Sequence, residues 1–272
     1  MNTKAKNNVR VLTECSIMIA LSTVLSVIKL FEMPYGGSIT LASMLPIAVI
    51  AHRHNIKYAV GSALVASVIQ LLLGLKNFSY FTTPESLIAL GVFDYILAFG
   101  VFGLVGICKK WIKSQSLAAT LGITLASALR YLCHVISGAT IWAGLSIPTE
   151  AAMVYSLSYN ATYMVPETII LVLTGAYLTS SLDFTQKTPK RLHSETVDSL
   201  SALCLSGAGL AVLAALITDT VLVFSKLQNY DSGEFMIMGL AEVNWLAVGI
   251  VTAVALAVAA ALILFAKIKK KA

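Results

Sequence analysis

The chain has 272 residues, of which 58% are hydrophobic and only 12% are charged. Soluble domains carry about 25% charged residues, so this composition excludes an ordinary soluble protein and indicates a polytopic membrane protein. The formal net charge is +6, which would also suit a nucleic-acid-binding protein until the positions of the cations are considered. The four cysteines lie far apart without Cys/His clustering, so neither a zinc site nor a disulfide framework is indicated: Cys15, Cys108, Cys133 and Cys204.

Eight apolar segments follow one another along the chain, and each is a candidate membrane helix. They cover residues 11–31, 39–53, 56–75, 85–108, 117–143, 152–180, 200–225 and 239–266. The first follows a polar, basic start and precedes no small-residue cleavage site, so we interpret it as an uncleaved helix. The second is short and contains Pro46, so we expect it to be tilted, shielded or only partly inserted.

Lysine and arginine are divided unequally between the loops on the two sides of the predicted membrane. One side has fifteen of the nineteen: Lys4, Lys6, Arg10, Arg53, Lys57, Lys109, Lys110, Lys113, Lys187, Lys190, Arg191, Lys267, Lys269, Lys270 and Lys271. The other side has only Lys29, Lys76 and Lys226. Cytoplasmic loops are enriched in these residues, so both termini are predicted to be cytoplasmic. The net positive charge is therefore explained by the membrane topology. The sequence also has no stripe of basic and aromatic residues of the kind that binds nucleic acid.

A polar stretch of mixed charge at residues 181–199 divides the chain into two parts. Residues 1–180 are predicted to form a six-helix membrane core that contains all the candidate site residues. Residues 181–199 are predicted to be a cytoplasmic linker. Residues 200–272 are predicted to form an additional pair of membrane helices with a basic tail, in which Asp219 is the one charge at depth. The expected fold class is therefore all-α.

Polar side chains occur at matched depths in three of the core segments. Asp94, His134 and Asn160 each lie about eight or nine residues from the outer end of their segment, which is about 12–14 Å along a helix. Arg130 and Glu167 form a second, deeper layer. Because a lone charge in hydrocarbon is costly, these two are predicted to form a structural ion pair between successive helices.

The outer layer has the composition of a ligand site. Arg130, His134, Gly138 and Trp142 recur every four residues and therefore form one stripe along a helix. We expect Gly138 to leave a gap in which a flat ring lies against the indole of Trp142. One carboxylate beside aromatic faces suits a flat organic cation. Further aromatic candidates stand near this layer, and some of them equally fit an ordinary interfacial belt: Tyr95, Tyr155 and Tyr159.

The loop at residues 32–38 (EMPYGGS) lies on the predicted outer side, next to this layer. Its Pro and Gly-Gly residues fit either a mobile lid that carries Tyr35 over a ligand or a plain turn. No nucleotide-binding GxxxxGK[ST], no GxSxG and no metal-ligand spacing occur in the chain. We therefore expect neither an enzyme nor a resident cofactor or metal.

In these residues the chain resembles the ThiT family, the thiamine-specific S-components of energy-coupling factor (ECF) transporters. The resemblance covers about residues 10–180. It is carried by residues 14–21 (ECSIMIAL), 34–38 (PYGGS), 44–47 (MLPI), Arg53, Asp94-Tyr95, Ala98-Phe99, Arg130-Tyr131, His134, Ser137-Gly138, Trp142, residues 155–157 (YSL) and Tyr159-Asn160. It implies a vitamin-binding core that takes thiamine from outside. The implied ligand contacts are Asp94, Tyr95, His134, Gly138, Trp142, Tyr155 and Asn160, with Asp94 facing the aminopyrimidine.

The resemblance also implies partners: a membrane coupling subunit and two cytoplasmic ATPases, in a bacterial plasma membrane. Ser16 and Ala20 form a small-xxx-small pattern of the kind that packs on another helix, although such spacings are common in membrane helices. Three features depart from the family pattern. Asp94 stands where Glu is frequent, Tyr35 stands where the first loop often has Trp, and the last helix pair exceeds the six-helix plan. An S-component for another vitamin or a thiamine precursor, and a non-transporting sensor or assembly protein, remain alternatives.

Overall fold

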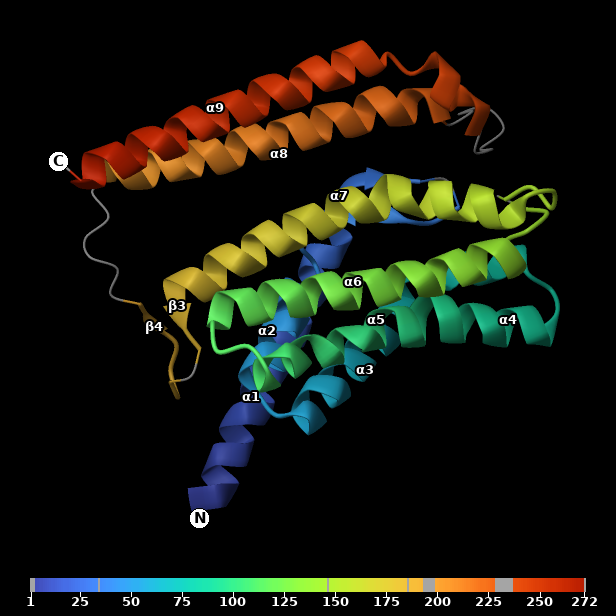
Figure 1. Ribbon diagram of the computed structural model, residues 1–272. Coiled ribbons are helices and arrows are strands. Elements are labelled where there is room, and N and C mark those ends of the chain that lie inside the picture. Colours follow the sequence, from blue (N-terminus) through green and yellow to red (C-terminus); the bar gives the residue numbers. More distant parts are fainter. Residues whose placement is uncertain are drawn as a thin grey trace. The chain divides into compact units, whose positions relative to one another are not determined.

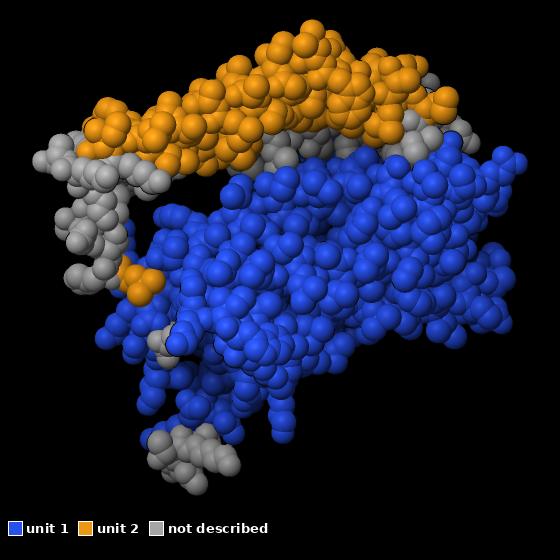
Figure 2. All heavy atoms as spheres, viewed as in Figure 1, with its two compact units in different colours: residues 1–191 blue, residues 192–272 orange. Residues whose placement is uncertain are grey.

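A computed structural model describes residues 3–33, 35–145, 147–184, 186–192, 199–227 and 237–271. Pro34 in the first loop and residues 185 and 193–198 of the expected linker lie outside this description. The chain divides into two compact units, residues 1–191 and residues 192–272 (Figure 2). Seven helices in the described part are long and apolar enough to cross a membrane. The expected all-α, polytopic membrane fold is confirmed.

The first unit begins with α1 (Thr3–Val27), which leads into a hairpin of β1 (Lys29–Glu32) and β2 (Ser38–Thr40). The second apolar segment follows as α2 (Leu45–Arg53), a helix of nine residues. At 1.5 Å per residue it is about 13 Å long and cannot cross a hydrocarbon core of about 30 Å. Residues 46–52 are all buried, so this helix is shielded by its neighbours rather than exposed to lipid.

The next elements are α3 (Ile56–Leu73) and a 3-10 turn, η1 (Leu75–Tyr80). The span that follows, Pro84–Lys110, changes its winding along its length. It runs as α4 (Pro84–Leu90), a π-helical turn η2 (Gly91–Leu97), α5 (Ala98–Gly100) and a 3-10 stretch η3 (Val101–Lys110). Short π-helical turns inside α-helices are rare and are frequent at functional sites. This one contains Asp94 and Tyr95.

The longest helices of the first unit, α6 (Gln115–Thr140) and α7 (Ala152–Ser181), lie side by side (Figure 1). Gly138 of α6 faces α7, because a Cβ there would lie 2.2 Å from Ser156 Oγ. Its missing side chain therefore lets the two helices approach closely at this point.

A short hairpin of β3 (Leu182–Asp183) and β4 (Lys190–Arg191) ends the first unit. The amide of Gln115 donates to the carbonyl oxygens of Thr179 and Leu182, at 2.8 Å each. Arg53 of α2 donates to the carbonyl oxygens of Phe184 and Lys187. Leu182, Phe184 and Lys187 are thus bonded to the helical core, and the compact unit extends beyond the boundary at residue 180 that the sequence suggested.

The second unit consists of α8 (Ser199–Leu227), a 3-10 turn η4 (Ile237–Glu242) and α9 (Trp245–Lys271). The two helices pack along each other (Figure 1), and the hydroxyl of Thr252 donates to Asp219 Oδ2 at 2.5 Å. The carboxylate at depth is therefore bonded within the pair. Large apolar side chains on the described outer faces are exposed, as expected for helices that contact lipid: Leu203, Leu210, Leu246 and Val254.

Candidate ligand-binding site

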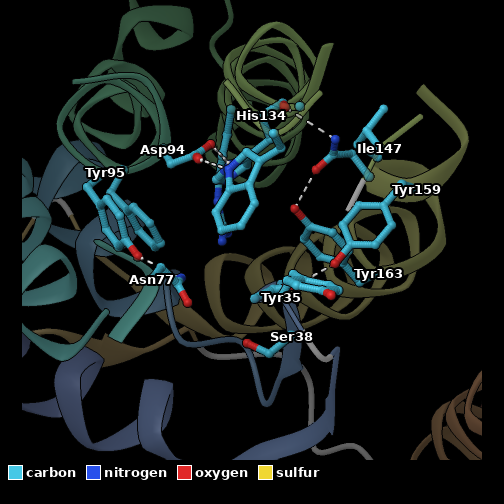
Figure 3. A pocket seen from close by; sticks show the side chains of 16 residues that line it. Tyr35, Ser38, Asn77, Asp94, Tyr95, His134, Ile147, Tyr159 and Tyr163 are labelled. Atoms are coloured by element: carbon cyan, nitrogen blue, oxygen red, sulfur yellow. Dashed lines mark hydrogen bonds and ion pairs between the residues drawn. The ribbon is translucent and has the colours of Figure 1, made fainter. Parts of the chain in front are cut away.

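A pocket of about 130 Å³ lies within the first unit, between the first loop, η1, the Pro84–Lys110 span, α6, the segment that follows it, and α7 (Figure 3). Its lining is mainly polar and aromatic. The lining residues are Tyr35, Gly36, Gly37, Ser38, Asn77, Asp94, Tyr95, Phe99, Arg130, His134, Gly138, Trp142, Ile147, Tyr159, Asn160 and Tyr163. Residues from six separate segments therefore converge on one space.

Asp94 is the acceptor on which three neighbours converge. Its Oδ1 lies 2.9 Å from His134 Nδ1, and its Oδ2 accepts from Ser137 Oγ at 2.6 Å and from Trp142 Nε1 at 2.9 Å. An anionic carboxylate requires His134 to carry its proton on Nδ1, which leaves Nε2 free to accept or donate. Three donors from α6 and the segment after it therefore fix the position of the Asp94 carboxyl group in the pocket.

Aromatic rings form one wall of the pocket around Trp142. The ring centroid of Phe81 lies 4.9 Å and that of Tyr80 lies 5.9 Å from the Trp142 ring. Tyr35 of the first loop lies 5.4 Å from Tyr80 and 6.5 Å from Trp142. Because Trp142 also donates to Asp94, its indole is held by a hydrogen bond as well as by the neighbouring rings. Such a wall offers π faces to a planar cation.

The first loop packs against α7. The hydroxyl of Tyr159 donates to the carbonyl oxygen of Gly36 at 2.9 Å. Gly37 has φ +86°, a conformation that favours glycine, and a Cβ there would lie 2.8 Å from the Tyr163 ring. Tyr163 in turn donates to Asn160 Oδ1 at 2.6 Å. The loop is therefore closed over the pocket in this structure, and it carries Tyr35 to the aromatic wall.

The amide of Asn160 is bonded mainly to the protein itself. Its Nδ2 donates to the carbonyl oxygens of Ser156, at 2.9 Å, and His134, at 3.2 Å. Together with the Tyr163 bond, this leaves the side chain little free hydrogen-bonding capacity. Asn160 thus lies in the pocket wall, as its depth in the sequence suggested, and it also bonds α7 to α6.

Below this layer, Arg130 Nη1 lies 3.1 Å from Glu167 Oε2. Glu167 Oε1 accepts from the hydroxyl of Thr40 at 2.7 Å, and the guanidinium lies 4.4 Å from the centroid of the Phe99 ring. A second cavity of about 380 Å³ reaches this pair from the β1–β2 hairpin and has Lys29 at its rim. The deep pair is therefore part of a network that includes β2 and reaches both cavities.

Several residues differ from their sequence-based placement or were not singled out. Tyr155 is half-buried on α7 and does not line the pocket, whereas Tyr159 does. Ser16 and Ala20 are exposed on α1. No group of three or more His, Cys, Asp or Glu side chains that could hold a metal occurs in the described part of the chain. The sequence analysis missed the pocket or wall residues contributed by η1 and by the loops: Asn77, Tyr80, Phe81 and Ile147.

A helical, multi-pass membrane protein with a polar and aromatic pocket in its core has the architecture of a small-molecule-binding membrane protein. Residues 12–186 match the family model described as thiamine transporter protein (Thia_YuaJ). The chain belongs to this thiamine transporter family.

Two relatives extend the comparison. The thiamine transporter ThiT of Bacillus subtilis is 32% identical over 173 residues, which cover 60% of this chain and 86% of that protein. The solved structure of ThiT from Listeria monocytogenes matches with a TM-score of 0.52 and 23% identity, over 63% of this chain and 94% of that one. The second match supports the fold of the core.

Proposed function

We propose that this chain is the substrate-binding membrane subunit of an ECF-type vitamin transporter, which binds thiamine from outside the cell. Membership of the thiamine transporter family supports the ligand. The observation that carries the proposal is the Asp94 carboxylate beside the Trp142 wall. Thiamine is a flat molecule with a permanent positive charge, and a counter-ion next to π faces is the recognition chemistry for such a cation.

The proposed division of roles follows the geometry. Asp94 supplies the counter-charge, His134 and Trp142 lie beside it as ring contacts, and Tyr95, Gly138 and Asn160 complete the wall. Tyr35 and Tyr159 hold the first loop over the ligand. Tyr155 keeps the role that the family resemblance implies only if the loop and α7 rearrange when the ligand binds.

The proposed partners are a membrane coupling subunit and two ATPases. The chain has no nucleotide-binding motif of its own, so transport against a gradient needs an outside source of energy. The exposed Ser16 and Ala20 on α1 offer a small-residue surface for a helix of the coupling subunit. The charge bias of the loops supports cytoplasmic termini, which would direct the first loop outward.

The test is a titration of the purified full-length chain with thiamine, followed by tryptophan fluorescence. Trp111 and Trp245 are exposed, 74% and 54%, so quenching should come from Trp142 and be absent in Trp142→Phe. We expect Asp94→Asn to weaken binding by about 100-fold, because a desolvated charge partner is lost. Glu85→Gln is the matched control, since it removes an exposed carboxylate from the same span.

Two outcomes would contradict the proposal. The first is absence of thiamine binding by the intact protein, with a different vitamin bound after purification. The second is full thiamine uptake by cells that lack the ATPase subunits, which would identify a stand-alone carrier.

A further inference from the structure

Some buried polar atoms without a hydrogen bond belong to residues of the pocket. Seven such side-chain atoms occur in the described part of the chain, and three of them belong to residues that line this pocket. They are Asn77 Oδ1, Arg130 Nε and His134 Nε2. A buried polar atom without a partner is costly. A ligand in the pocket can supply a partner for each of these three atoms. Asn77 is the one residue among them to which neither the sequence analysis nor the proposed function gives a role.

The orientation of the Asn77 amide is determined by its neighbours. The hydroxyl of Tyr95 donates to the carbonyl oxygen of Gly74 at 3.2 Å, so the same oxygen accepts from Asn77 Nδ2 at 3.0 Å. A flipped amide would place Oδ1 against a hydroxyl whose proton is already used. Asn77 therefore presents Oδ1 as an acceptor in one defined position (Figure 3).

The surroundings of Asn77 leave just enough room for this arrangement. A Cβ on Gly74 would lie 2.1 Å from the Tyr95 hydroxyl oxygen, and a Cβ on Gly36 would lie 2.9 Å from Asn77 Nδ2. Asn77 is thus half-buried on η1, next to the π-helical turn and the first loop. It lines the pocket, and its bond to Tyr95 holds the amide in place.

Asn77 also lies where the two cavities meet. It lines the pocket that contains Asp94 and the second cavity, whose rim includes Lys29 and Lys76. A ligand group that extends from the first pocket toward the second cavity would therefore meet Asn77. A neutral amide oxygen offers no counter-charge, so it suits a neutral donor, namely a hydroxyl group, better than a second cationic group.

We infer that Asn77 is a specificity-determining acceptor for a hydroxyl group on the flexible arm of the ligand. This inference rests on the proposed function, because thiamine carries such a hydroxyl on a two-carbon arm. A site built to bond a hydroxyl rejects an analogue without it, since the buried acceptor then stays unpaired. The ligand hydroxyl donates its proton to Asn77 Oδ1 and no covalent bond changes.

The experiment compares thiamine with its deoxy analogue, in which the hydroxyl is replaced by hydrogen, on the purified full-length chain by calorimetry. In the unsubstituted protein we expect the analogue to bind about tenfold more weakly. In Asn77→Leu, which keeps the volume and lacks the acceptor, this ratio should fall to about onefold to twofold. Tyr95→Phe, which frees the amide to flip, should give an intermediate ratio. Gln70→Leu is the matched control, because Gln70 lines the second cavity and not the first.

A tenfold ratio that persists in Asn77→Leu, or an equal loss for both ligands, would overturn the inference while leaving thiamine binding intact. A ratio that also falls in Gln70→Leu would overturn it, because the discrimination would then belong to the second cavity. If the unsubstituted protein binds neither compound, the proposed function itself fails, and the inference fails with it.

Discussion

Arg130 and Glu167 form a buried ion pair below the pocket, with only 8% and 4% of their surface exposed. Each partner neutralises the other at 3.1 Å, and Thr40 gives the carboxylate a second bond. Removal of one partner leaves a buried charge without compensation, which is more costly than removal of both. The pair therefore constrains which substitutions the core tolerates.

We expect Arg130→Met and Glu167→Gln, made singly, each to destabilise the protein by about 3–5 kcal/mol, and the double variant to lose less than the sum of the two. Thermal unfolding in detergent measures this. Lys29 and Glu32 form the control pair, because they are partly exposed at 2.7 Å and single changes there should cost at most about 1 kcal/mol. Strictly additive losses at the buried pair would contradict a structural ion pair.

The residues of the site differ in how far the sequence reveals them. Depth counting was enough to place Asp94, His134 and Asn160 in one layer, because charges and amides are rare in apolar helices. Asn77 gave no such signal, since it lies in a short polar stretch after α3 where hydropathy has no period. Only the bond to Tyr95 and the packing under Gly36 distinguish it from a surface asparagine.

At the scale of elements, Glu32 connects the β1–β2 hairpin to η1. Its Oε1 accepts from Lys29 Nζ at 2.7 Å and from Lys76 Nζ at 2.8 Å. Both bonds lower the pKa of Glu32 below its ordinary value of 4.5, and the bond from Lys29 has the larger effect. A lowered pKa means that the contact is fully present above the ordinary pKa and is lost as the pH falls through the lowered one.

We therefore expect Glu32→Gln to release bound thiamine about twofold to threefold faster at neutral pH, because a surface ion pair contributes little. The difference from the unsubstituted protein should be constant above about pH 5 and should disappear in more acidic buffer, as Glu32 takes up its proton. Stopped-flow dissociation measures both. Glu85→Gln should leave the rate unchanged, and a difference that instead vanishes at alkaline pH would contradict the assignment to Glu32.

The contact between α6 and α7 depends on the absence of a side chain at Gly138. We expect Gly138→Ala to lower the unfolding free energy by about 1–3 kcal/mol, because its Cβ would overlap Ser156 Oγ. Addition of Ser156→Ala removes that atom and should recover part of the loss. Gly61→Ala is the control, since nothing lies within 4 Å of a Cβ there. A destabilisation that Ser156→Ala does not relieve would assign another role to Gly138.

Hydropathy identified the membrane-spanning helices but not their winding. The Pro84–Lys110 span is apolar enough to cross a membrane, but nothing in its composition shows that residues 91–97 form a π-helical turn. The turn matters because it lets Asp94 reach α6 while its neighbour Tyr95 bonds to η1. Likewise, residues 39–53 are apolar enough for a helix, but the hairpin before α2 takes the residues that a full span would need.

At the scale of the whole molecule, the core and the α8–α9 pair are separate compact units, and all residues that line the pocket belong to the first. The Bacillus subtilis relative aligns with this chain over 173 residues, and the family model ends at residue 186. The core is thus the part shared with the family, and the pair is an addition to it.

A chain that ends at residue 192 should therefore bind thiamine with a Kd within about twofold of the full-length value, because no pocket contact is lost.

The position of the cut is important. A chain that ends at residue 180 loses Leu182 and Phe184, which bond to Gln115 and Arg53, and should unfold at a lower temperature than the longer form. Calorimetry and thermal unfolding of both forms separate these effects. Loss of binding in the chain that ends at residue 192, with its unfolding temperature unchanged, would mean that α8 and α9 take part in the site.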